Sequence, residues 1–409
     1  MFDSTCRPLG PRDLILGIGA CVCLLLPVRV TTAQQADWPT HGWPESTAEE
    51  QQVNGALLDK LDEDIRLGTY GYVDRLLVIR NGYVIKNERY EVDYKKVSQG
   101  FSSDIGCGWE SCEDQAQTVD PYNYLYPDLH PYYQGRDVHS LQSITKSVAA
   151  TAIGVALQRG DIESMNALLL SFFDDYDVSK VDERLHKATL ADLLTHRSGI
   201  EWHEQDRPLD DSNTTIQLEK SQDWIQFTLN QPMDADPGIK WAYNSGGSHL
   251  ISGVIKEATG DFIDVYAEKH LFGPLGIDDY HWKKTPKGYP DTEGGLYLEA
   301  EQLAKVGLLY LKNGRWEDGQ LLPAGWVSDA ISVKAPSINP QGWGYGYQWW
   351  RVDQGSIEVW AGLGFGGQYM FVLPQYDMIG VVNSWNLYDQ PPASIFVGFL
   401  NAMIRSRPQ

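Results

Sequence analysis

Segments with the pattern of β-strands lie near both ends of this chain, and the region between them is helical. Near the start, the apolar stretches 76–80 and 83–85 flank Asn81-Gly82, a dipeptide typical of the tight turn in a β-hairpin. Near the end, four more stretches have strand character: 345–351, 356–361, 368–373 and 378–384. An alternating series of strands and helices would predict a parallel sheet. This order instead predicts an α+β fold with one sheet built from both chain ends.

The helical region contains one segment that must be buried. From Ser143 to Gly160 the residues are apolar nearly all round the helix, which leaves no face for solvent. Other helices are predicted at 57–66, 188–195, 221–229, 247–259, 262–272, 299–313 and 393–405. The 42% hydrophobic content suffices for a sizeable core. We divide the chain after its first 33 residues into a leader with a helix (34–69) and a single domain (70–409).

Residues 1–33 have the three parts of a secretory signal peptide. Arg7 and Arg12 precede an apolar run over 14–28, and small residues follow at 31–33. A retained N-terminal anchor is the alternative interpretation, but the apolar run is short for a membrane span. We therefore expect an exported protein, periplasmic or secreted, without stable membrane insertion once the signal peptide is cleaved.

Cleavage would leave two of the five cysteines, Cys107 and Cys112, inside an irregular Tyr-rich insertion over 96–138. In an exported chain, two cysteines five positions apart predict a local disulfide. The alternative is a redox or metal-binding pair, but the two-residue spacing and a second pair of ligands are lacking. The nine histidines show no metal-like spacing either. We expect neither a metal site nor a cofactor.

The charge balance argues against two classes of partner. With 33 Lys and Arg against 55 Asp and Glu, the formal net charge is −22. Such a surface repels nucleic acids and anionic lipids, so we expect no nucleic-acid partner. The sequence leaves the oligomeric state open.

Ser143-Ile144-Thr145-Lys146 begins the buried helix and carries a candidate nucleophile. The i, i+3 spacing places the Ser143 hydroxyl and the Lys146 amine on one helix face. A serine becomes nucleophilic when a neighbour removes its proton, and an apolar interior would lower the pKa of Lys146 towards that role. The helix N-terminus adds N–H donors for an oxyanion. The tetrapeptide alone is common by chance, but a lysine on a buried apolar helix requires a role or a partner.

Two further motifs could complete a site. Tyr243 opens the turn Tyr243-Asn244-Ser245-Gly246-Gly247, where an adjacent ammonium would favour its phenolate; a packed aromatic at a helix cap is the alternative. The stretch Gly362-Leu363-Gly364-Phe365-Gly366-Gly367-Gln368 satisfies the dinucleotide pattern G-x-G-x-x-G, but it precedes a strand, so we reject that interpretation. Its glycines would instead let a ligand approach, and one N–H there could form an oxyanion hole with Ser143. A plain Gly-rich turn is the alternative.

In this order, the motifs resemble the serine β-lactamase and penicillin-binding superfamily, closest to its branch of esterases and 6-aminohexanoate-dimer hydrolases. The strings that carry the resemblance are His139-Ser140-Leu141-Gln142 before the serine motif, Asp192-Leu193-Leu194-Thr195-His196-Arg197-Ser198-Gly199, and the two motifs above. The resemblance covers roughly 70–405 and implies a β-lactamase/transpeptidase-like fold. In that fold an antiparallel sheet is flanked by helices, with the active site between the sheet and the helical region.

The resemblance also implies roles for the matched residues. Ser143 would form an acyl-enzyme, with Lys146 and Tyr243 as acid and base, and Tyr243 would protonate the leaving group. Which of those two holds the proton at rest stays open. Residues implied at the oxyanion hole and the substrate, besides the N–H of Ser143, are Phe365, Gly364, Gly366 and Ser245.

The sequence departs from the family pattern in two places. Ser245 stands where many relatives have Asn, two positions after the tyrosine. β-Lactamases and peptidases carry Lys-Thr-Gly beside the site, where this chain has Gly362-Leu363-Gly364. The missing lysine favours small esters or amides without the carboxylate that the lysine would hold. We expect an exported serine hydrolase; the alternatives are a β-lactamase, a D-Ala-D-Ala carboxypeptidase, or a cell-wall-binding or sensor relative without turnover.

Overall fold

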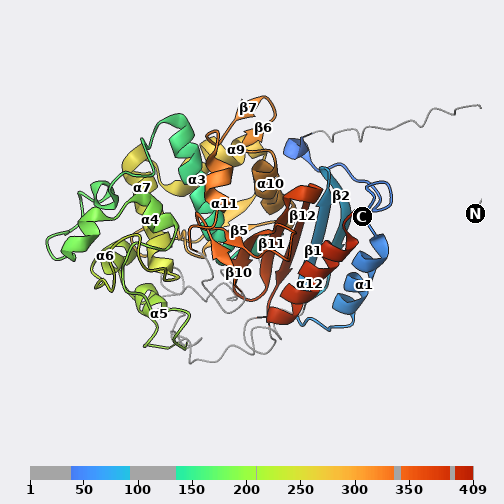
Figure 1. Ribbon diagram of the computed structural model, residues 1–409, viewed down its shortest axis with the longest axis horizontal. Helices are drawn as coiled ribbons and strands as arrows, with labels where there is room; N and C mark the ends of the chain where they lie inside the picture. Colours follow the sequence, from blue (N-terminus) through green and yellow to red (C-terminus); the bar gives the residue numbers. More distant parts are fainter. Residues whose placement is uncertain (1–37, 93–134, 209, 336–341, 387–391, 409) are drawn as a thin grey trace, which may run out of the picture. The chain divides into compact units, whose positions relative to one another are not determined.

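The computed structural model describes residues 38–92, 135–208, 210–335, 342–386 and 392–408. In these residues seven strands form one antiparallel sheet with the order β2-β1-β12-β11-β10-β9-β8. The strands are β1 (Val73–Arg80), β2 (Tyr83–Arg89), β8 (Gly344–Tyr345), β9 (Trp350–Arg351), β10 (Trp360–Gly364), β11 (Gln368–Leu373) and β12 (Met378–Ser384). Strand β1 pairs with β12, so the two ends of the chain meet in the sheet (Figure 1). This confirms the predicted α+β arrangement.

The predicted N-terminal hairpin is present, and its turn explains its sequence. Asn81 and Gly82 connect β1 to β2 with positive φ angles of 53° and 81°. Two successive residues in this left-handed region form the turn whose twist matches a hairpin, and Asn-Gly adopts it at little cost.

One predicted strand is wrong. The stretch 345–351 is divided into β8 and β9, which pair with each other. The N–H of Gly346 donates to the oxygen of Trp349 over 2.9 Å, and Gln348 has a φ of 59°, so the chain reverses there. The strand predicted at 356–361 begins only at Trp360, because Gln354 and Ile357 first close a turn.

Helices cover both faces of the sheet. On one face lie α3 (Ile144–Arg159) and α10 (Ala300–Leu311); on the other lie α12 (Pro392–Ser406) and α1 (Gly55–Arg66), which contact each other (Figure 1). The helices pack closely against the sheet on both faces. A side chain on Gly307 of α10 would press on Ile379, and one on Gly380 of β12 would press on Met403.

The remaining elements belong to the helical region and to two small sheets. The helices are α4 (Leu190–Leu194), α5 (Thr214–Glu219), α6 (Trp224–Leu229), α7 (Ser245–Thr259), α8 (Ile263–Ala267), α9 (Gly273–Leu275) and α11 (Trp326–Ile331). The small sheets contain β3 (His139–Ser140), β5 (Leu296–Leu298) and β4 (Tyr280–Trp282), and the pair β6 (Arg315–Trp316) and β7 (Gly319–Gln320).

Helix α3 is the interior helix that the sequence predicts. Every residue from Ile144 to Ala156 is buried, and the helix ends at Gly160 with a φ of 80°. The helix packs against α7 and β10, which belong to the helical region and to the sheet respectively. Its first turn therefore lies where the two parts of the fold meet.

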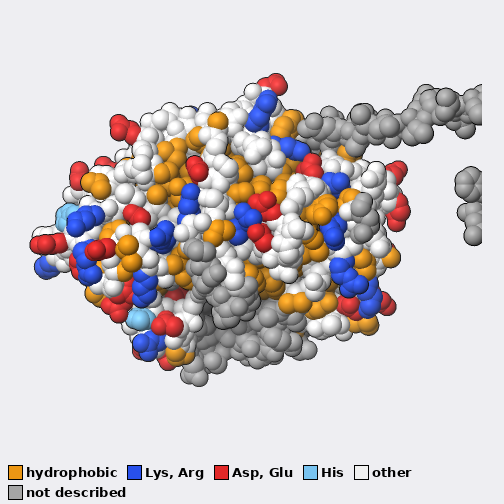
Figure 2. All heavy atoms as spheres, viewed as in Figure 1, with side chains coloured by type: hydrophobic (Ala, Val, Ile, Leu, Met, Phe, Trp, Pro, Cys, Tyr) orange, Lys and Arg blue, Asp and Glu red, His pale blue; other side chains and the backbone are white. Residues whose placement is uncertain are grey.

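Two sequence-based predictions fall outside the described residues: the signal peptide over 1–33 and the disulfide between Cys107 and Cys112. Of the helices that are described, none combines the length and the apolar character needed to span a membrane. On the face drawn in Figure 2, acidic and basic side chains are interspersed.

Candidate active site

Ser143 lies at a sharp backbone turn immediately before α3. Gln142, the preceding residue, has a positive φ of 48°, which is uncommon for a residue with a side chain. The N–H groups of Ile144 and Thr145 donate to the carbonyl oxygens of Leu141 and Gln142. The turn leaves the Ser143 side chain partly accessible at the N-terminus of a helix whose interior is fully buried.

Lys146 follows one helical turn later and directs its amine at the serine. Its Nζ lies 2.9 Å from Oγ of Ser143, and the residue is 0% exposed. The same Nζ donates to the backbone oxygen of Glu293 over 2.6 Å and lies 3.3 Å from Oε2 of that residue. Serine and lysine are thus brought together as the spacing predicts.

The lysine is not the neutral amine that its apolar helix suggests. Burial alone would lower the pKa of Lys146, but the charges of Tyr243 and Glu293, followed by Glu204, raise it above its ordinary value. The predicted lowering of the lysine pKa is therefore wrong. Periodicity places Lys146 in the interior but cannot show which carboxylates the rest of the chain brings to it.

Tyr243 comes from the segment before α7, a hundred residues from the serine. Its hydroxyl hydrogen-bonds Ser143, and its ring centroid lies 5.2 Å from Nζ of Lys146. Burial raises the pKa of Tyr243, and the lysine only partly opposes that effect. The ring stacks on Trp350 at a centroid distance of 5.9 Å, which fixes the direction of the hydroxyl.

The glycine-rich turn joins β10 to β11 beside the serine. A Cβ atom on Gly364 would lie less than 3.0 Å from the carbonyl oxygen of Leu141, so this strand end contacts the segment that presents Ser143. Phe365 follows with its side chain 36% exposed, and Gly366 has a φ of 78°. The turn thus lies next to the N-terminus of α3, where a second oxyanion donor would be required.

Ser245 has a different neighbour from the one implied. It is buried at the start of α7, and its hydroxyl donates to Oε1 of Glu204 over 2.8 Å. Its N–H donates to the other oxygen of Glu204 over 3.0 Å. Ser245 therefore holds a carboxylate behind the site, and among the described residues no hydrogen bond joins its side chain to Ser143.

A cluster of carboxyl groups behind Lys146 is the part that sequence reasoning missed. Glu219 and Glu293 hydrogen-bond each other, and Asp291 accepts from the N–H of Glu293 over 2.9 Å. Burial raises the pKa of Asp291 to about 7 and that of Glu219 well above its usual range, whereas Lys146 holds the pKa of Glu293 low. Because these residues come from separate loops and helices, no local spacing could have identified them. Within the described ranges, no group of His, Cys, Asp or Glu has the arrangement of a metal site.

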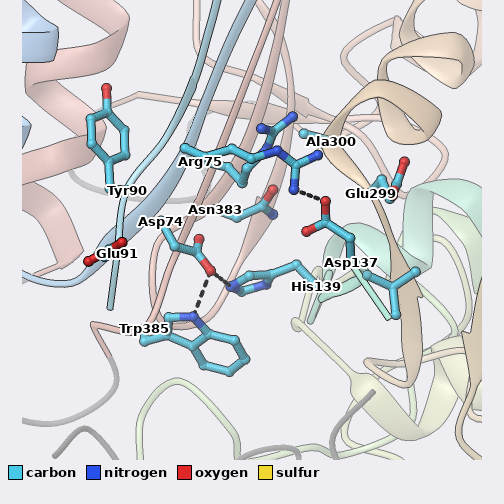
Figure 3. A pocket seen from close by; sticks show the side chains of 12 residues that line it. Asp74, Arg75, Tyr90, Glu91, Asp137, His139, Glu299, Ala300, Asn383 and Trp385 are labelled. Atoms are coloured by element: carbon cyan, nitrogen blue, oxygen red, sulfur yellow. Dashed lines mark hydrogen bonds and ion pairs between the residues drawn. The ribbon is translucent and has the colours of Figure 1, made fainter. Parts of the chain in front are cut away.

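A cavity of about 380 Å³ lies at the same end of the sheet, and its lining includes none of Ser143, Lys146 and Tyr243. Figure 3 shows Asp74 of β1 between His139 and Trp385. Oδ2 of Asp74 accepts from Nε1 of Trp385 over 2.9 Å and lies 3.3 Å from Nε2 of His139. These contacts anchor β3, whose chain leads within four residues to Ser143.

A serine on a helix N-terminus, contacted by a lysine one turn later and by a distant tyrosine beside an antiparallel sheet, is the arrangement expected of a β-lactamase-related serine hydrolase. The family model described as Beta-lactamase matches residues 128–394, more than half of the chain, and the chain belongs to this family. This confirms the resemblance seen in the motifs.

Among the similar proteins, the 6-aminohexanoate-dimer hydrolase of Paenarthrobacter ureafaciens is 24% identical over 300 residues, which cover 68% of this chain and 74% of the hydrolase. A solved 6-aminohexanoate-dimer hydrolase homologue from Bacillus anthracis superposes with a TM-score of 0.64, at 17% identity, covering 91% of this chain and 89% of the homologue. A family VIII carboxylesterase gives a TM-score of 0.59 at 14% identity, covering 89% and 98%. At such identities the two structures support the fold.

Proposed function

We propose that this protein hydrolyses small esters or amides through an acyl-enzyme on Ser143, with Lys146 and Tyr243 handling the protons. One observation carries the proposal: Oγ of Ser143 is contacted by both the buried Lys146 amine, at 2.9 Å, and the Tyr243 hydroxyl. A serine held by two proton-exchanging groups at the N-terminus of a helix is suited to nucleophilic attack on a carbonyl.

The reaction divides into acylation and deacylation. In acylation, deprotonated Tyr243 takes the proton of Ser143 while Oγ bonds to the carbonyl carbon, and the N–H groups of Ser143 and Phe365 bind the oxyanion. The C–O or C–N bond then breaks, and Tyr243 returns the proton to the leaving alcohol or amine. In deacylation, water loses its proton to Tyr243, its oxygen bonds to the acyl carbon, and Ser143 leaves with the returned proton.

The strand beside the site supports the substrate class. Strand β10 carries Gly362-Leu363-Gly364, so a glycine stands where a Lys-Thr-Gly strand would supply a cation. A carboxylate on the substrate would find no charge partner on this strand. We therefore favour uncharged esters and amides over β-lactams and D-Ala-D-Ala peptides. The names lovastatin esterase and 6-aminohexanoate-dimer hydrolase among the relatives agree with this choice.

A substrate panel tests the proposal. Purified protein is incubated with short p-nitrophenyl esters, linear amides and nitrocefin, and the Ser143 peptide is examined by mass spectrometry for the acyl group. We expect turnover of esters or amides, a transient acyl adduct on Ser143, and loss of both in Ser143→Ala. Full activity in Ser143→Ala would overturn the mechanism. Rapid nitrocefin turnover would favour a β-lactamase, and stable stoichiometric labelling a sensor.

We further propose that the protein is exported after cleavage of residues 1–33 and that Cys107 and Cys112 then form a disulfide. The support is the charged, apolar and small-residue order of that segment and the pairing expected in an oxidising compartment.

A further inference from the structure

We propose that Glu219 and Glu293 share one proton and together act as the counter-ion of Lys146, which keeps the lysine an ammonium and leaves Tyr243 to take the serine proton. This inference rests on the proposed role of Ser143. It assigns two positioning residues and gives the base role in the lysine–tyrosine pair to Tyr243.

The first step is the number of oxygens around the lysine nitrogen. Nζ of Lys146 faces Oγ of Ser143 at 2.9 Å, the backbone oxygen of Glu293 at 2.6 Å and Oε2 of Glu293 at 3.3 Å. An ammonium has three N–H donors for three such acceptors. A neutral amine would have two donors and would have to accept its third hydrogen bond from the Ser143 hydroxyl. The carboxylate oxygen of Glu293 at 3.3 Å favours the charged form.

The second step is the direction of the serine proton. If the ammonium donates to Oγ, that oxygen accepts from Lys146, and its own O–H is left to donate elsewhere. The other contact of the Ser143 hydroxyl is Tyr243, and this hydrogen bond stabilises the phenolate form of the tyrosine. The proton of Ser143 therefore already points at Tyr243.

The third step is the pairing of two carboxyl groups. Glu219, 2% exposed on α5, hydrogen-bonds Glu293, which is 8% exposed. Two carboxyl oxygens can form a hydrogen bond only if one carries a proton. Oε2 of Glu219 has no hydrogen-bond partner within the described residues, and a bare charge there would be costly. Glu219 is the protonated member, so the pair carries one negative charge against one positive charge on Lys146.

Other titratable groups also lie around the lysine. Glu204, from the segment after α4, is bonded by Ser245, and Asp291 precedes Glu293 in the chain. Lys283 acts on Glu219 and Asp291. His196 is buried against the rings of Tyr243 and Tyr345, and burial, with Lys146 adding to it, keeps its pKa well below the usual range.

The positive charge of Lys146 is neutralised by the carboxyl pair only if Glu293 is charged. Replacing Glu293 by the isosteric Gln keeps the shape but removes the negative charge, so a proton should leave Lys146 more easily. Replacing Glu219 by Gln keeps both the donor and the neutral state. The two substitutions differ in charge while matching in size.

The experiment follows Lys146 directly, by the Cε chemical shift in protein labelled with ¹³C-lysine, with the resonance assigned by its loss in Lys146→Met. Between about pH 7 and 10.5 we expect no titration in the wild type, because the ordinary lysine pKa is already about 10.4 and is raised here. We expect Glu293→Gln to titrate at least one pH unit lower, and Glu219→Gln to remain like the wild type. In parallel, the pH at which the rate of Ser143 acylation by a p-nitrophenyl ester rises should fall in Glu293→Gln alone.

Each contrary result has a definite meaning. Lys146 titrating alike in Glu293→Gln and the wild type would overturn the counter-ion, and an equal shift in Glu219→Gln would overturn the shared proton. Because the NMR titration needs no turnover, absence of acylation in the wild type would reject the proposed function while the titration still decides this inference. If Glu293→Gln does not fold, Glu293→Gln/Lys146→Met decides instead. Recovery of its melting temperature supports the pair, and no recovery overturns it.

Discussion

Gly364 at the end of β10 lies against the carbonyl oxygen of Leu141, two residues before Ser143, so closely that a Cβ atom would come within 3.0 Å. The contact joins the sheet to the backbone that presents Ser143. Gly364→Ala should therefore displace that backbone or the glycine-rich turn. We expect kcat/KM to fall at least tenfold, because a small misplacement of the reacting groups has a large effect on rate. Steady-state hydrolysis of a p-nitrophenyl ester measures the loss.

Gly319→Ala is the control for this substitution. Gly319 lies exposed on β7, where a Cβ atom would be no closer than 3.4 Å to its nearest neighbour, and its φ is not positive. We expect kcat/KM of this variant to stay within twofold of the wild type. Equal activities of the two variants would show that the contact with Leu141 does not position the site.

Tyr243 and Tyr345 offer a matched test of the base. Both are tyrosines of the same aromatic cluster with ring centroids 6.3 Å apart, but only Tyr243 hydrogen-bonds Ser143. The Tyr345 hydroxyl lies 3.5 Å from Oε1 of Gln348. Tyr243→Phe should lower kcat by roughly 10²–10⁴-fold, the usual contribution of a general base. Tyr345→Phe should lower it less than tenfold. Comparable losses in both would make the Tyr243 hydroxyl a packing group.

The hydrolytic activity should rise towards alkaline pH. Burial raises the pKa of Tyr243, and the carboxylates and Tyr243 raise that of Lys146 despite burial, so near neutral pH both groups hold their protons. Catalysis needs one of those protons removed. Below the pKa of the base, kcat/KM should increase about tenfold per pH unit.

This rise is measured as kcat/KM from pH 6 to 10, after the background rate of the Ser143→Ala variant is subtracted at each pH. A profile that is flat or falling above pH 7 would mean that a group other than this pair limits the reaction.

The sequence predicts the parts of this site that local patterns encode. The helical spacing of Ser143 and Lys146, the apolar interior of α3 and the Asn81-Gly82 hairpin each depend on a few neighbouring residues. The family motifs then add Tyr243, which no spacing connects to the serine. Architecture follows from the same signals, because strands at both chain ends leave few ways to form one sheet.

What the sequence could not predict is set by contacts between distant segments. Glu293 meets Lys146 from 147 positions away, and the charges of Tyr243 and Glu293 together reverse the lysine pKa shift expected from burial alone. Gln348 breaks the strand predicted at 345–351 by adopting a positive φ, which its residue type does not announce. Both errors arise because a residue's properties were predicted from its neighbours in sequence, whereas they depend on contacts with distant segments.

The exported form has a definite chemical signature. When the full chain is produced in a bacterium, cleavage should give a periplasmic or secreted protein whose N-terminus lies near residue 34. Under non-reducing conditions a peptide containing both Cys107 and Cys112 should have a mass two hydrogens below that of the reduced form. Peptide mass spectrometry before and after reduction measures both features. An intact N-terminus in the membrane fraction would instead indicate the retained anchor.

Glu219 provides a stability test with a defined sign. Burial, followed by the charge of Glu293, raises its pKa in the folded protein well above the value of about 4.3 in an unfolded chain. Above about pH 5 the folded state therefore binds a proton that the unfolded state has lost, so the free energy of unfolding falls as pH rises. The expected slope is about 1.4 kcal/mol per pH unit until the raised pKa is reached. Gln carries no such proton, so Glu219→Gln removes this slope while other titrating groups contribute equally to both proteins. Urea denaturation at pH 5, 6 and 7 should show the variant gaining stability relative to the wild type with each step. A constant difference across that range would mean that Glu219 is ionised in the folded protein.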